Sequence, residues 1–251
     1  GNLDDAIINV NLDPVLEFDG DNDYMNVTTS PIYTANPDDF TISAWIYVDD
    51  VSADMNGALG QIVADAAGSD PTSGGFWLGY SDRGGTHDPT EGIAWNIKTN
   101  AGFQRGKSDD NVVSSGSWHH IALTLDGQAT LYVDGVDVTN RSTDNSGTFT
   151  RTNNNLTVAD DDAGNFPFNG KITDVRLYDI ALSASNVQVL ASKINGSSSL
   201  GAGTGDLQAW WKLNEGTGTS ITDHSTNSNT GTLTNFIGTY WLFDAFSVNV
   251  Q

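Results

Sequence analysis

The chain has 251 residues, a formal net charge of −22 at pH 7 and no cysteine. This length fits one β-sandwich or two small domains, and it is enough to bury a core without disulfides. The negative charge would repel DNA, RNA and anionic membranes, and the sequence shows no cluster of lysine and arginine that could bind them. These partners are therefore excluded. No window approaches the roughly 18 apolar residues of a membrane helix, and no signal peptide opens the chain. The chain begins at Gly1, so we expect it to be processed or excised.

The acidic residues are strongly biased, because only three of the 32 are glutamate (Glu17, Glu91 and Glu215). Aspartate and asparagine favour turns whereas glutamate favours helices, so the composition predicts many loops and little helix. Two interpretations of the aspartates stay open. They form a solvated acidic surface, or some of them bind divalent cations.

The first predicted elements flank a turn. The segment Asp19–Asp23 lies between the apolar positions Leu16 and Phe18 on one side and Tyr24 on the other. Aspartate side chains can accept hydrogen bonds from nearby backbone amides, so this segment predicts the turn of an opening hairpin. The alternate aspartates also suggest an EF-hand loop, but that loop needs glycine at its sixth position and glutamate at its twelfth. Tyr24 and Ser30 occupy those positions. We therefore expect a turn, with a cation site as the alternative.

Alternating side chains predict the next strands. Along residues 40–48, Phe40, Ile42, Ala44, Ile46 and Val48 share one face. Along residues 118–125, the same spacing places His119, Ile121, Leu123 and Leu125 on one face and Trp118, His120, Ala122 and Thr124 on the other. Bulky groups on both faces indicate a central strand of a sandwich. Asp134-Gly135 follows between two apolar runs and predicts a two-residue hairpin turn.

A helix is predicted at about Ala184 to Ile194. Ser183 or Ser185 can cap it, Gln188 can complete a capping box from Ser185, and Gly196 lies beyond its end. Residues 195–205 have the composition of a flexible linker.

Four blocks of sequence resemble a known family. They are Leu16–Asp23, Phe40–Ile46, Ser117–Gly135 and Phe168–Ser183, in family order between about residues 14 and 194. They resemble the laminin-G-like domains of the concanavalin A-like lectin/glucanase superfamily, to which pentraxins are distantly related. The resemblance implies an all-β, antiparallel jelly-roll β-sandwich of two curved sheets with one short helix.

The segment 206–251 also resembles the beginning of a laminin-G-like repeat, although it follows the end of one. It is either the truncated start of a second repeat or a circularly permuted part that returns to complete the first. If the segment stood alone, Trp210, Trp211 and Trp241 would be exposed and would make it prone to aggregation. We therefore expect the return, with residues 1–251 forming a single domain.

Catalysis is not expected, although the superfamily includes enzymes that cleave glycans. Its laminarinase-like branch carries Glu-x-Asp-x-Glu on one strand, whose alternate residues place two carboxylates about 5–5.5 Å apart. The three glutamates here lie too far apart in sequence for that motif. The histidines His87, His119, His120 and His224 lie beside no Gly-x-Ser-x-Gly elbow, and we expect His119 and His120 to be packing residues.

The resemblance to pentraxins implies a candidate calcium site. The pentraxin loop before the closing strand supplies acidic ligands, and by that resemblance Asp160 and Asp162 would supply carboxylates and Asp161 a backbone oxygen. A second loop, Asp65 to Asp70, would supply the other side. Independently of the family, three adjacent carboxylates repel unless they are solvated or neutralised, and calcium accepts 6–8 oxygen ligands. A solvated acidic loop is the alternative.

Aromatic residues provide a candidate sugar-binding surface. Trp77, Tyr80 and Trp95 lie in strand-like segments and could stack on sugar C–H groups, with core packing as the alternative. The polar loop that follows Tyr80 contains Asp82 and Arg83, which we expect on a binding rim.

The sequence therefore predicts a non-catalytic module that recognises a glycan or a surface protein. We expect calcium as a candidate cofactor, an adhesion role, and an extracellular, cell-surface or virion location. A homo-oligomer or a larger assembly is compatible with this prediction. The alternatives are a structural appendage or phage-particle protein that packs against neighbouring proteins, and a polysaccharide hydrolase or lyase.

Overall fold

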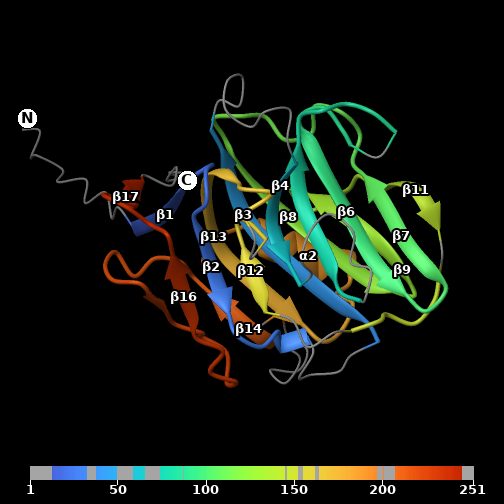
Figure 1. The fold of residues 1–251 in the computed structure, drawn as a ribbon. Helices are drawn as coiled ribbons and strands as arrows, with labels where there is room; N and C mark the ends of the chain where they lie inside the picture. The colour runs from blue at the N-terminus through green and yellow to red at the C-terminus, as the bar shows by residue number, and fades with distance from the viewer. Residues whose placement is uncertain are drawn as a thin grey trace, which may run out of the picture.

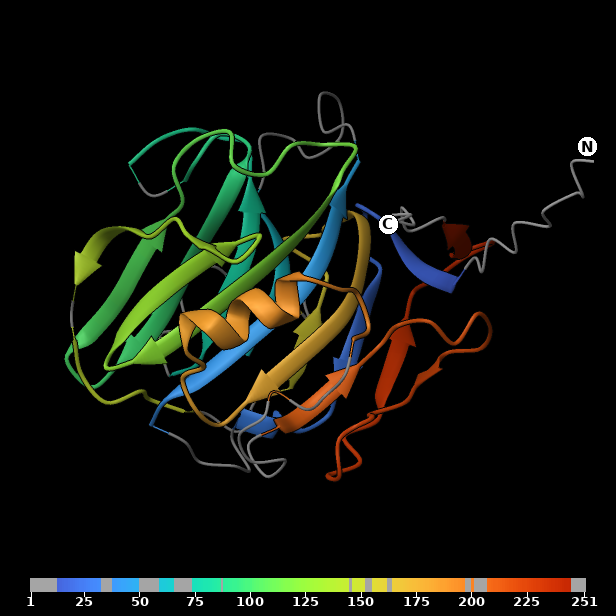
Figure 2. The ribbon, with the colours of Figure 1, turned by 180° about the vertical axis from the view of Figure 1, so that it is seen from behind.

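A computed structural model describes residues 13–32, 38–49, 59–65, 74–86, 88–144, 146–151, 155–161, 164–196, 200 and 207–244. Two antiparallel sheets pack face to face, and a helix lies on the outer face of one of them (Figures 1 and 2). The predicted all-β jelly-roll sandwich is confirmed. The sheet nearer the viewer in Figure 1 is called the front sheet, and the other is called the back sheet.

The back sheet has the order β10-β9-β8-β3-β13-β1-β17, and β14 also pairs with β13. Its strands are β10 (Val136–Asp137), β9 (Gln128–Val133), β8 (Trp118–Asp126), β3 (Phe40–Val48), β13 (Asn169–Tyr178), β1 (Asp13–Asp19), β17 (Trp241–Asp244) and β14 (Leu207–Trp211).

The front sheet has the order β11-β7-β6-β5-β4-β12-β2-β16-β15. Its strands are β11 (Asn140–Asp144), β7 (Gly102–Lys107), β6 (Gly92–Thr99), β5 (Phe76–Ser81), β4 (Leu59–Ala64), β12 (Leu156–Val158), β2 (Tyr24–Val27), β16 (Gly231–Thr234) and β15 (Ser220–Ile221).

The core lies between the two sheets and is built by strand alternation. The alternate apolar residues of β3, from Phe40 to Val48, are all buried in one cluster. Ile121, Leu123 and Leu125 of β8 enter the same cluster, whereas Ala122 belongs to a second cluster on the outer face of the back sheet. The predicted faces of both strands are therefore confirmed. Each fully buried aliphatic side chain contributes roughly 1.5–3 kcal/mol.

The hairpin between β9 and β10 turns at Asp134 and Gly135, as predicted. Their φ angles are +51° and +77°, and Val136 pairs with Val133 across the turn. Two consecutive positive φ angles are those of a type I′ turn, which glycine adopts freely and aspartate tolerates.

The prediction of an opening hairpin is wrong. Asp19 does stabilise a turn, because its Oδ1 accepts the N–H of Asp21 at 3.0 Å. However, β1 pairs with β13 and β17 in the back sheet, whereas β2 pairs with β12 and β16 in the front sheet. The turn therefore carries the chain from one sheet to the other, and the local turn residues do not determine which strands pair.

The helix α2 (Ala184–Ala191) begins at the Ser183 N-cap, whose Oγ accepts the N–H of Asn186. It ends three residues earlier than predicted, where the Ser192 N–H and Oγ both donate to the Val189 carbonyl. Val187 and Leu190 face the back sheet and pack into the second cluster. The helix thus covers the outer face of the back sheet (Figure 2).

The C-terminal segment contributes strands to both sheets. β14 pairs with β13, β17 pairs with β1, and β16 pairs with β2. Trp211 is completely buried in the main core. These pairings are those that a returning segment requires, and the single-domain organisation of residues 1–251 stays a prediction.

Candidate functional site

The outer face of the front sheet carries a small apolar cluster separate from the core. On β5, Phe76, Leu78 and Tyr80 face the core, so the intervening Trp77 faces outward. Trp77 keeps 7% of its surface exposed and packs with three small or aliphatic residues of neighbouring strands and with Phe166. No described helix lies across this face, in contrast to the back sheet (Figures 1 and 2).

Polar and charged side chains continue from Trp77 across the next two strands. Trp77 lies opposite Asn96 of β6, which lies opposite Arg105 of β7. Lys98 lies opposite Phe103 in the same strand pair. Since neighbouring strands lie about 4.8 Å apart, these residues extend over about 10 Å. Trp77, Asn96, Lys98, Phe103 and Arg105 are called the front-face site.

A partly exposed aromatic ring forms the outer part of the front-face site. Lys98 Nζ lies 4.2 Å from the centroid of the Phe103 ring, and Arg105 Cζ lies 4.5 Å from it. Both distances are within cation–π range. Sequence reasoning missed these three residues. The alternation of residues 102–107 places Phe103 and Arg105 on one face, but only the strand register brings Lys98 to them.

The loop that begins at Asp160 folds toward the Trp77 cluster. Asp160 Oδ1 accepts the N–H groups of Asp161 at 2.7 Å and Phe166 at 2.8 Å. The Phe166 carbonyl accepts the N–H of Gln61, which lies in β4. Asp161 binds the N–H and the side-chain amide of Asn165, both at 2.9 Å. The two aspartates therefore shape the loop that places Phe166 against Trp77.

The second carboxylate oxygen of Asp160 is unusual. Asp160 is fully buried, and its Oδ2 has no hydrogen-bond partner in the part of the chain that the structure describes. Burial raises the pKa of Asp160 to about 7, although the N–H groups of Phe166 and Asp161 partly offset this effect. A buried oxygen of this kind would be satisfied by a proton or by a cation.

The predicted calcium ligands do not all come together. Thr157 of β12 pairs with Ala64 of β4, so Asp65 lies beside Leu156, and Asp160 follows the opposite end of β12. Four residues of strand separate the two positions by roughly 13 Å. Asp65 itself therefore does not join the Asp160 site, whereas the rest of the predicted loop, residues 66–70, lies outside the described residues.

Asp65 is itself fully buried, and burial raises its pKa well above the usual range, an effect that the nearby Ser30 hydroxyl only partly offsets. The predicted ligands Asp70 and Asp162 lie outside the described residues, as does His87. Within the described ranges, no group of three or more His, Cys, Asp or Glu side chains is placed to hold a metal ion. Since calcium takes 6–8 oxygens, the described side chains alone do not form its site.

Two of the predicted sugar-stacking residues belong to the core. Tyr80 is fully buried and Trp95 is 1% exposed, and both lie in the main cluster between the sheets. The prediction that Tyr80 and Trp95 stack on a sugar is wrong. Trp77 and Tyr80 are three residues apart on one strand, so they must face opposite sides, and this parity was visible in the sequence.

The predicted rim residues lie away from Trp77. Asp82 and Arg83 follow the end of β5 and are exposed, and the N–H of Arg83 donates to Ser81 Oγ at 3.2 Å. Five strand residues separate Trp77 from Asp82 by roughly 16 Å. The structure brings Trp77 together with β6 and β7 rather than with this rim.

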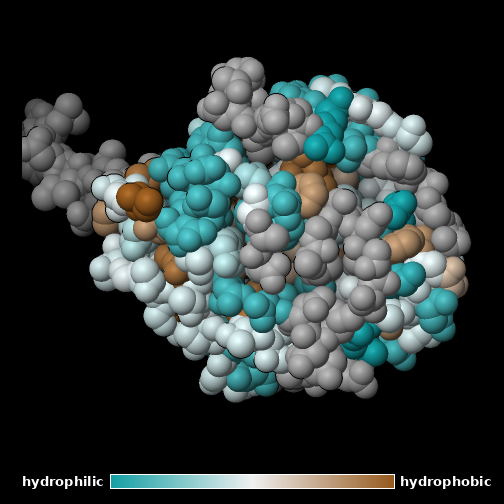
Figure 3. Space-filling view, in the orientation of Figure 1, coloured by the Kyte–Doolittle hydropathy of each residue, from teal (hydrophilic) through white to brown (hydrophobic). Residues whose placement is uncertain are grey.

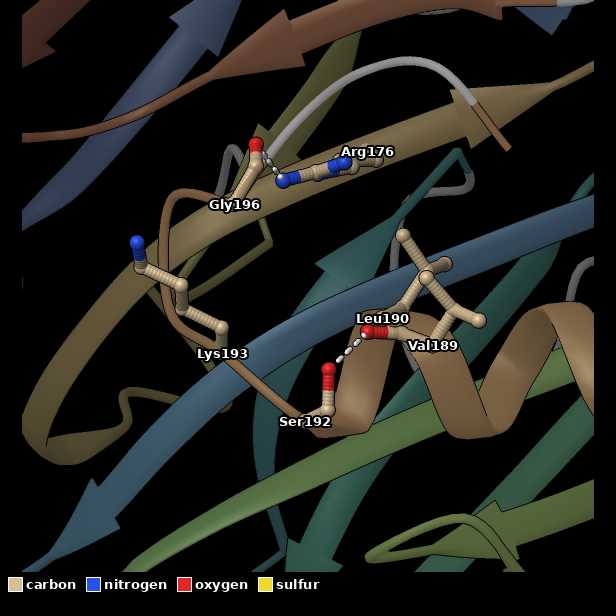
Figure 4. A pocket seen from close by; sticks show the side chains of 6 residues that line it. All are labelled: Arg176, Val189, Leu190, Ser192, Lys193 and Gly196. Atoms are coloured by element: carbon tan, nitrogen blue, oxygen red, sulfur yellow. Dashed lines mark hydrogen bonds between the residues drawn. The ribbon is translucent and has the colours of Figure 1, made fainter. Parts of the chain in front are cut away.

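A pocket on the other side of the molecule lies between the end of α2 and β13 (Figure 4). Its lining residues are Arg176, Val189, Leu190, Ser192, Lys193 and Gly196. The Arg176 guanidinium is already bound to both carboxylate oxygens of Asp174 and to the Gly196 carbonyl, and it lies over the Trp210 ring. The charged group that faces the pocket is therefore already engaged within the fold.

Three side chains on the back sheet form a hydrogen-bonded chain. Ser114 Oγ lies 3.0 Å from His119 Nε2, and His119 Nδ1 lies 2.8 Å from Asp134 Oδ2. The same two imidazole nitrogens are used in serine-hydrolase triads. Asp134 Oδ1 also accepts the N–H of His120, so the carboxylate fastens the β9–β10 turn to β8.

Sequence comparison identifies the family. A laminin-G model described as "Concanavalin A-like lectin/glucanases superfamily" matches residues 19–188, more than half of the chain. The chain belongs to this superfamily. Comparison with curated proteins gave no match.

The solved structures that resemble this chain are distant from it in sequence. One is the "putative carbohydrate binding protein" of Bacteroides ovatus, with 20% identity and a TM-score of 0.60. Its match covers 88% of this chain, which spans 58% of that protein. The heptameric SAP-like pentraxin of Limulus polyphemus has 15% identity and a TM-score of 0.50, with coverages of 74% and 84%. Mouse laminin α1 domains LG4-5 have 14% identity and a TM-score of 0.46, with coverages of 68% and 44%.

Proposed function

We propose that the protein is a non-catalytic carbohydrate-recognition module and that the glycan binds at the front-face site. The observation that carries the proposal is the partly exposed Phe103 ring, with polar donors beside it and the apolar Trp77 cluster next to it. Sugar sites typically combine an aromatic platform with a few converging polar groups. The family and the Bacteroides relative support this choice.

A glycan array followed by binding measurements tests the proposal. We expect the wild-type protein to bind at least one glycan and Phe103→Ala to weaken that binding about tenfold or more, because one stacking face is lost. Tyr47→Ala is a matched control, since Tyr47 also lies under a lysine but on the back sheet. Equal binding by the wild type and F103A, or weakening by Y47A alone, would contradict the placement.

Calcium dependence, adhesion and an extracellular, cell-surface or virion location form part of the same proposal. Asp160 Oδ2 supports calcium as a ligand atom that lacks a partner in the described structure. A complete calcium site would need further ligands, for which Asp162 is the candidate by sequence position. No helix among the described residues is long and apolar enough to span a bilayer.

A structural role in packing against neighbouring proteins is the second candidate. Ile237 and Phe243 of the C-terminal segment are 92% and 63% exposed, and Figure 3 shows strongly hydrophobic atoms where β17 lies. Exposed apolar side chains of this size commonly mark contact surfaces. Light scattering over a concentration series tests it. An oligomer that Phe243→Ser dissociates, together with no glycan binding, would favour this candidate.

The third candidate, a hydrolase, rests on Ser114, His119 and Asp134. A working triad also needs oxyanion donors and a substrate cleft. Labelling with a fluorophosphonate probe tests it directly. We expect no labelling; labelling that Ser114→Ala abolishes would replace the non-catalytic proposal.

A further inference from the structure

The two strands that carry the outer part of the front-face site have an unusual charge. β6 and β7 contain Lys98, Arg105 and Lys107 and no acidic residue, in a chain whose net charge is −22. The three cations are separated in sequence and form no basic cluster along the chain. Alternation places all three on the outer face, because Ile93, Trp95 and Ile97 of β6 face the core. Figure 3 shows the darkest hydrophilic colour beside hydrophobic atoms where β7 lies.

Lys107 is engaged within the fold and does not carry the inference. Its Nζ donates to the Gly85 carbonyl at 2.8 Å and to the Asp88 carbonyl at 3.4 Å, and it lies 3.7 Å from Asp110. These contacts fix the long loop after β5. Lys98 differs, since no ion pair is present for it among the described residues, and its ammonium lies over Phe103.

Lys98 and Arg105 are held close together by the fold. Both cations lie within 4.5 Å of the centroid of one ring, so they repel each other. A neutral sugar could accept hydrogen bonds from the two cations but would not reduce the repulsion between them. An anionic group placed near the two cations would reduce this repulsion and would accept charge-assisted hydrogen bonds from them.

We propose that the front-face site binds the acidic groups of an anionic polysaccharide, with Lys98 and Arg105 contacting the oxyanion and Phe103 lying against the sugar. This inference rests on the proposed carbohydrate-binding function and specifies its ligand class. The rest of the acidic molecule repels a polyanion, so binding is confined to the face where β6 and β7 lie. Nucleic acid is a poorer fit, because its binding requires many phosphate contacts and two cations supply few.

Affinity electrophoresis tests the proposal with three polymer gels. Polygalacturonate presents carboxylates, dextran sulfate presents sulfates, and dextran is the neutral reference. We expect retardation by at least one acidic polymer and not by dextran, and the two acidic gels distinguish the anion. Raising the salt concentration should weaken the retardation, because the charges are partly exposed.

A pair of double variants with equal net charge makes the test specific. Lys98→Ala/Arg105→Ala should weaken binding of the acidic polymer about tenfold or more. Lys171→Ala/Lys193→Ala is the control. It removes the same charge elsewhere and also removes one cation–π contact, between Lys171 and Tyr47. Thermal melting of both variants checks that a loss of binding is not a loss of folding.

The outcomes separate this inference from the function on which it rests. If the protein binds a neutral glycan, and F103A weakens that binding but K98A/R105A does not, the inference of an anionic ligand is overturned. The proposed carbohydrate-binding function would then still stand. No binding to any glycan would overturn both. Equal weakening by the two double variants would show a general effect of charge and would overturn the inference. The inference would also be overturned if the protein bound an oligonucleotide more tightly than either acidic polymer and K98A/R105A abolished that binding.

Discussion

His119 Nδ1 lies 2.8 Å from Asp134 Oδ2, and the other oxygen of that carboxylate accepts the N–H of His120 at 2.8 Å. One side chain in a hairpin turn thus binds both a side chain and the backbone of the preceding strand. Burial raises the pKa of the Asp134 carboxylate, but the hydrogen bonds from His119 and His120 outweigh burial and hold the pKa below its usual range.

Asp134→Asn should therefore destabilise the protein at neutral pH by about 1–2 kcal/mol, because a half-exposed charged hydrogen bond is weakened. Asparagine tolerates the positive φ, so the turn itself is retained. A carboxylate with a lowered pKa stabilises above its unfolded pKa and loses this effect as the pH falls through the folded value. The difference between variant and wild type in urea unfolding should be present at pH 7 and shrink below about pH 4. Ser114→Ala should have a smaller effect, and a constant difference across pH would contradict the assignment.

The buried Asp160 predicts the opposite pH dependence. Its pKa is raised by burial from 3.8 to about 7, so the folded protein keeps a proton that the unfolded chain releases. Its contribution to stability is therefore lost as the pH rises from about 4 to about 7. We expect Asp160→Asn to melt above the wild type at pH 8, with the difference shrinking toward pH 5. Asp126→Asn, at an exposed aspartate, is the control. A difference that does not change with pH would rule out a proton on Asp160.

Calcium should act through the same carboxylate if it is a ligand. We expect added calcium to raise the melting temperature of the wild type at pH 8 and a chelator to reverse the rise. At a free calcium concentration about one hundred times Kd, the gain is about 2.7 kcal/mol. Asp160→Asn should abolish most of the gain, and magnesium should act weakly because it requires stricter octahedral geometry. An equal response of D160N, or no response of the wild type, would remove calcium from the proposal.

Gly106 is required by the packing of Trp95. A Cβ added at Gly106 would overlap the Trp95 ring, which is almost fully buried between the sheets. Gly106→Ala should cost about 1–3 kcal/mol in the free energy of unfolding through overpacking. Combining it with Trp95→Phe should cost less than the sum of the two single variants, since the smaller ring leaves room for the new methyl group. Strict additivity in denaturant unfolding would show that the two residues do not conflict.

The C-terminal segment should be indispensable for folding. Trp211 is fully buried in the main core, and Trp210 donates its indole N–H to the buried Asp174 at 2.7 Å. Trp211→Ala should cost about 3–5 kcal/mol. Trp118→Ala is matched in chemistry but lies on a partly exposed face, so it should cost clearly less. A chain ending after residue 206 should lose cooperative thermal unfolding. A stable, cooperative fragment would support the second-repeat alternative.

The sequence predicted the parts of the fold that depend on local pattern. Alternation in β3 and β8 gave the correct faces, and Asp134-Gly135 gave the hairpin turn. Parity alone does not say which face of a strand is buried. Tyr80 and Trp95 were predicted at a surface, but their strands turn them into the core. Local pattern also does not say which strands pair. The turn at Asp19–Asp23 was predicted correctly, but the strands on either side of it do not pair with each other.

The candidate site was predicted less well because it depends on strand register. Phe103 and Lys98 meet only because β6 and β7 pair at those positions. The resemblance to pentraxins predicted that Asp65 and Asp160 lie close together, but the register between β4 and β12 separates them. Of the three predicted sugar-stacking residues, Trp77 alone faces away from the core, and Phe166 packs against it, so its contact with a sugar stays a prediction.

The pairing of β1 with β17 has a mechanical consequence. Asp13 pairs with Asp244, so the start of the first described strand lies opposite the end of the last one. Tension applied at these two points would peel β17 from β1 one hydrogen-bonded pair at a time instead of shearing many pairs at once. Stretching the chain would thus open this seam first, while the distant strands β6 and β7 would keep their shape under load.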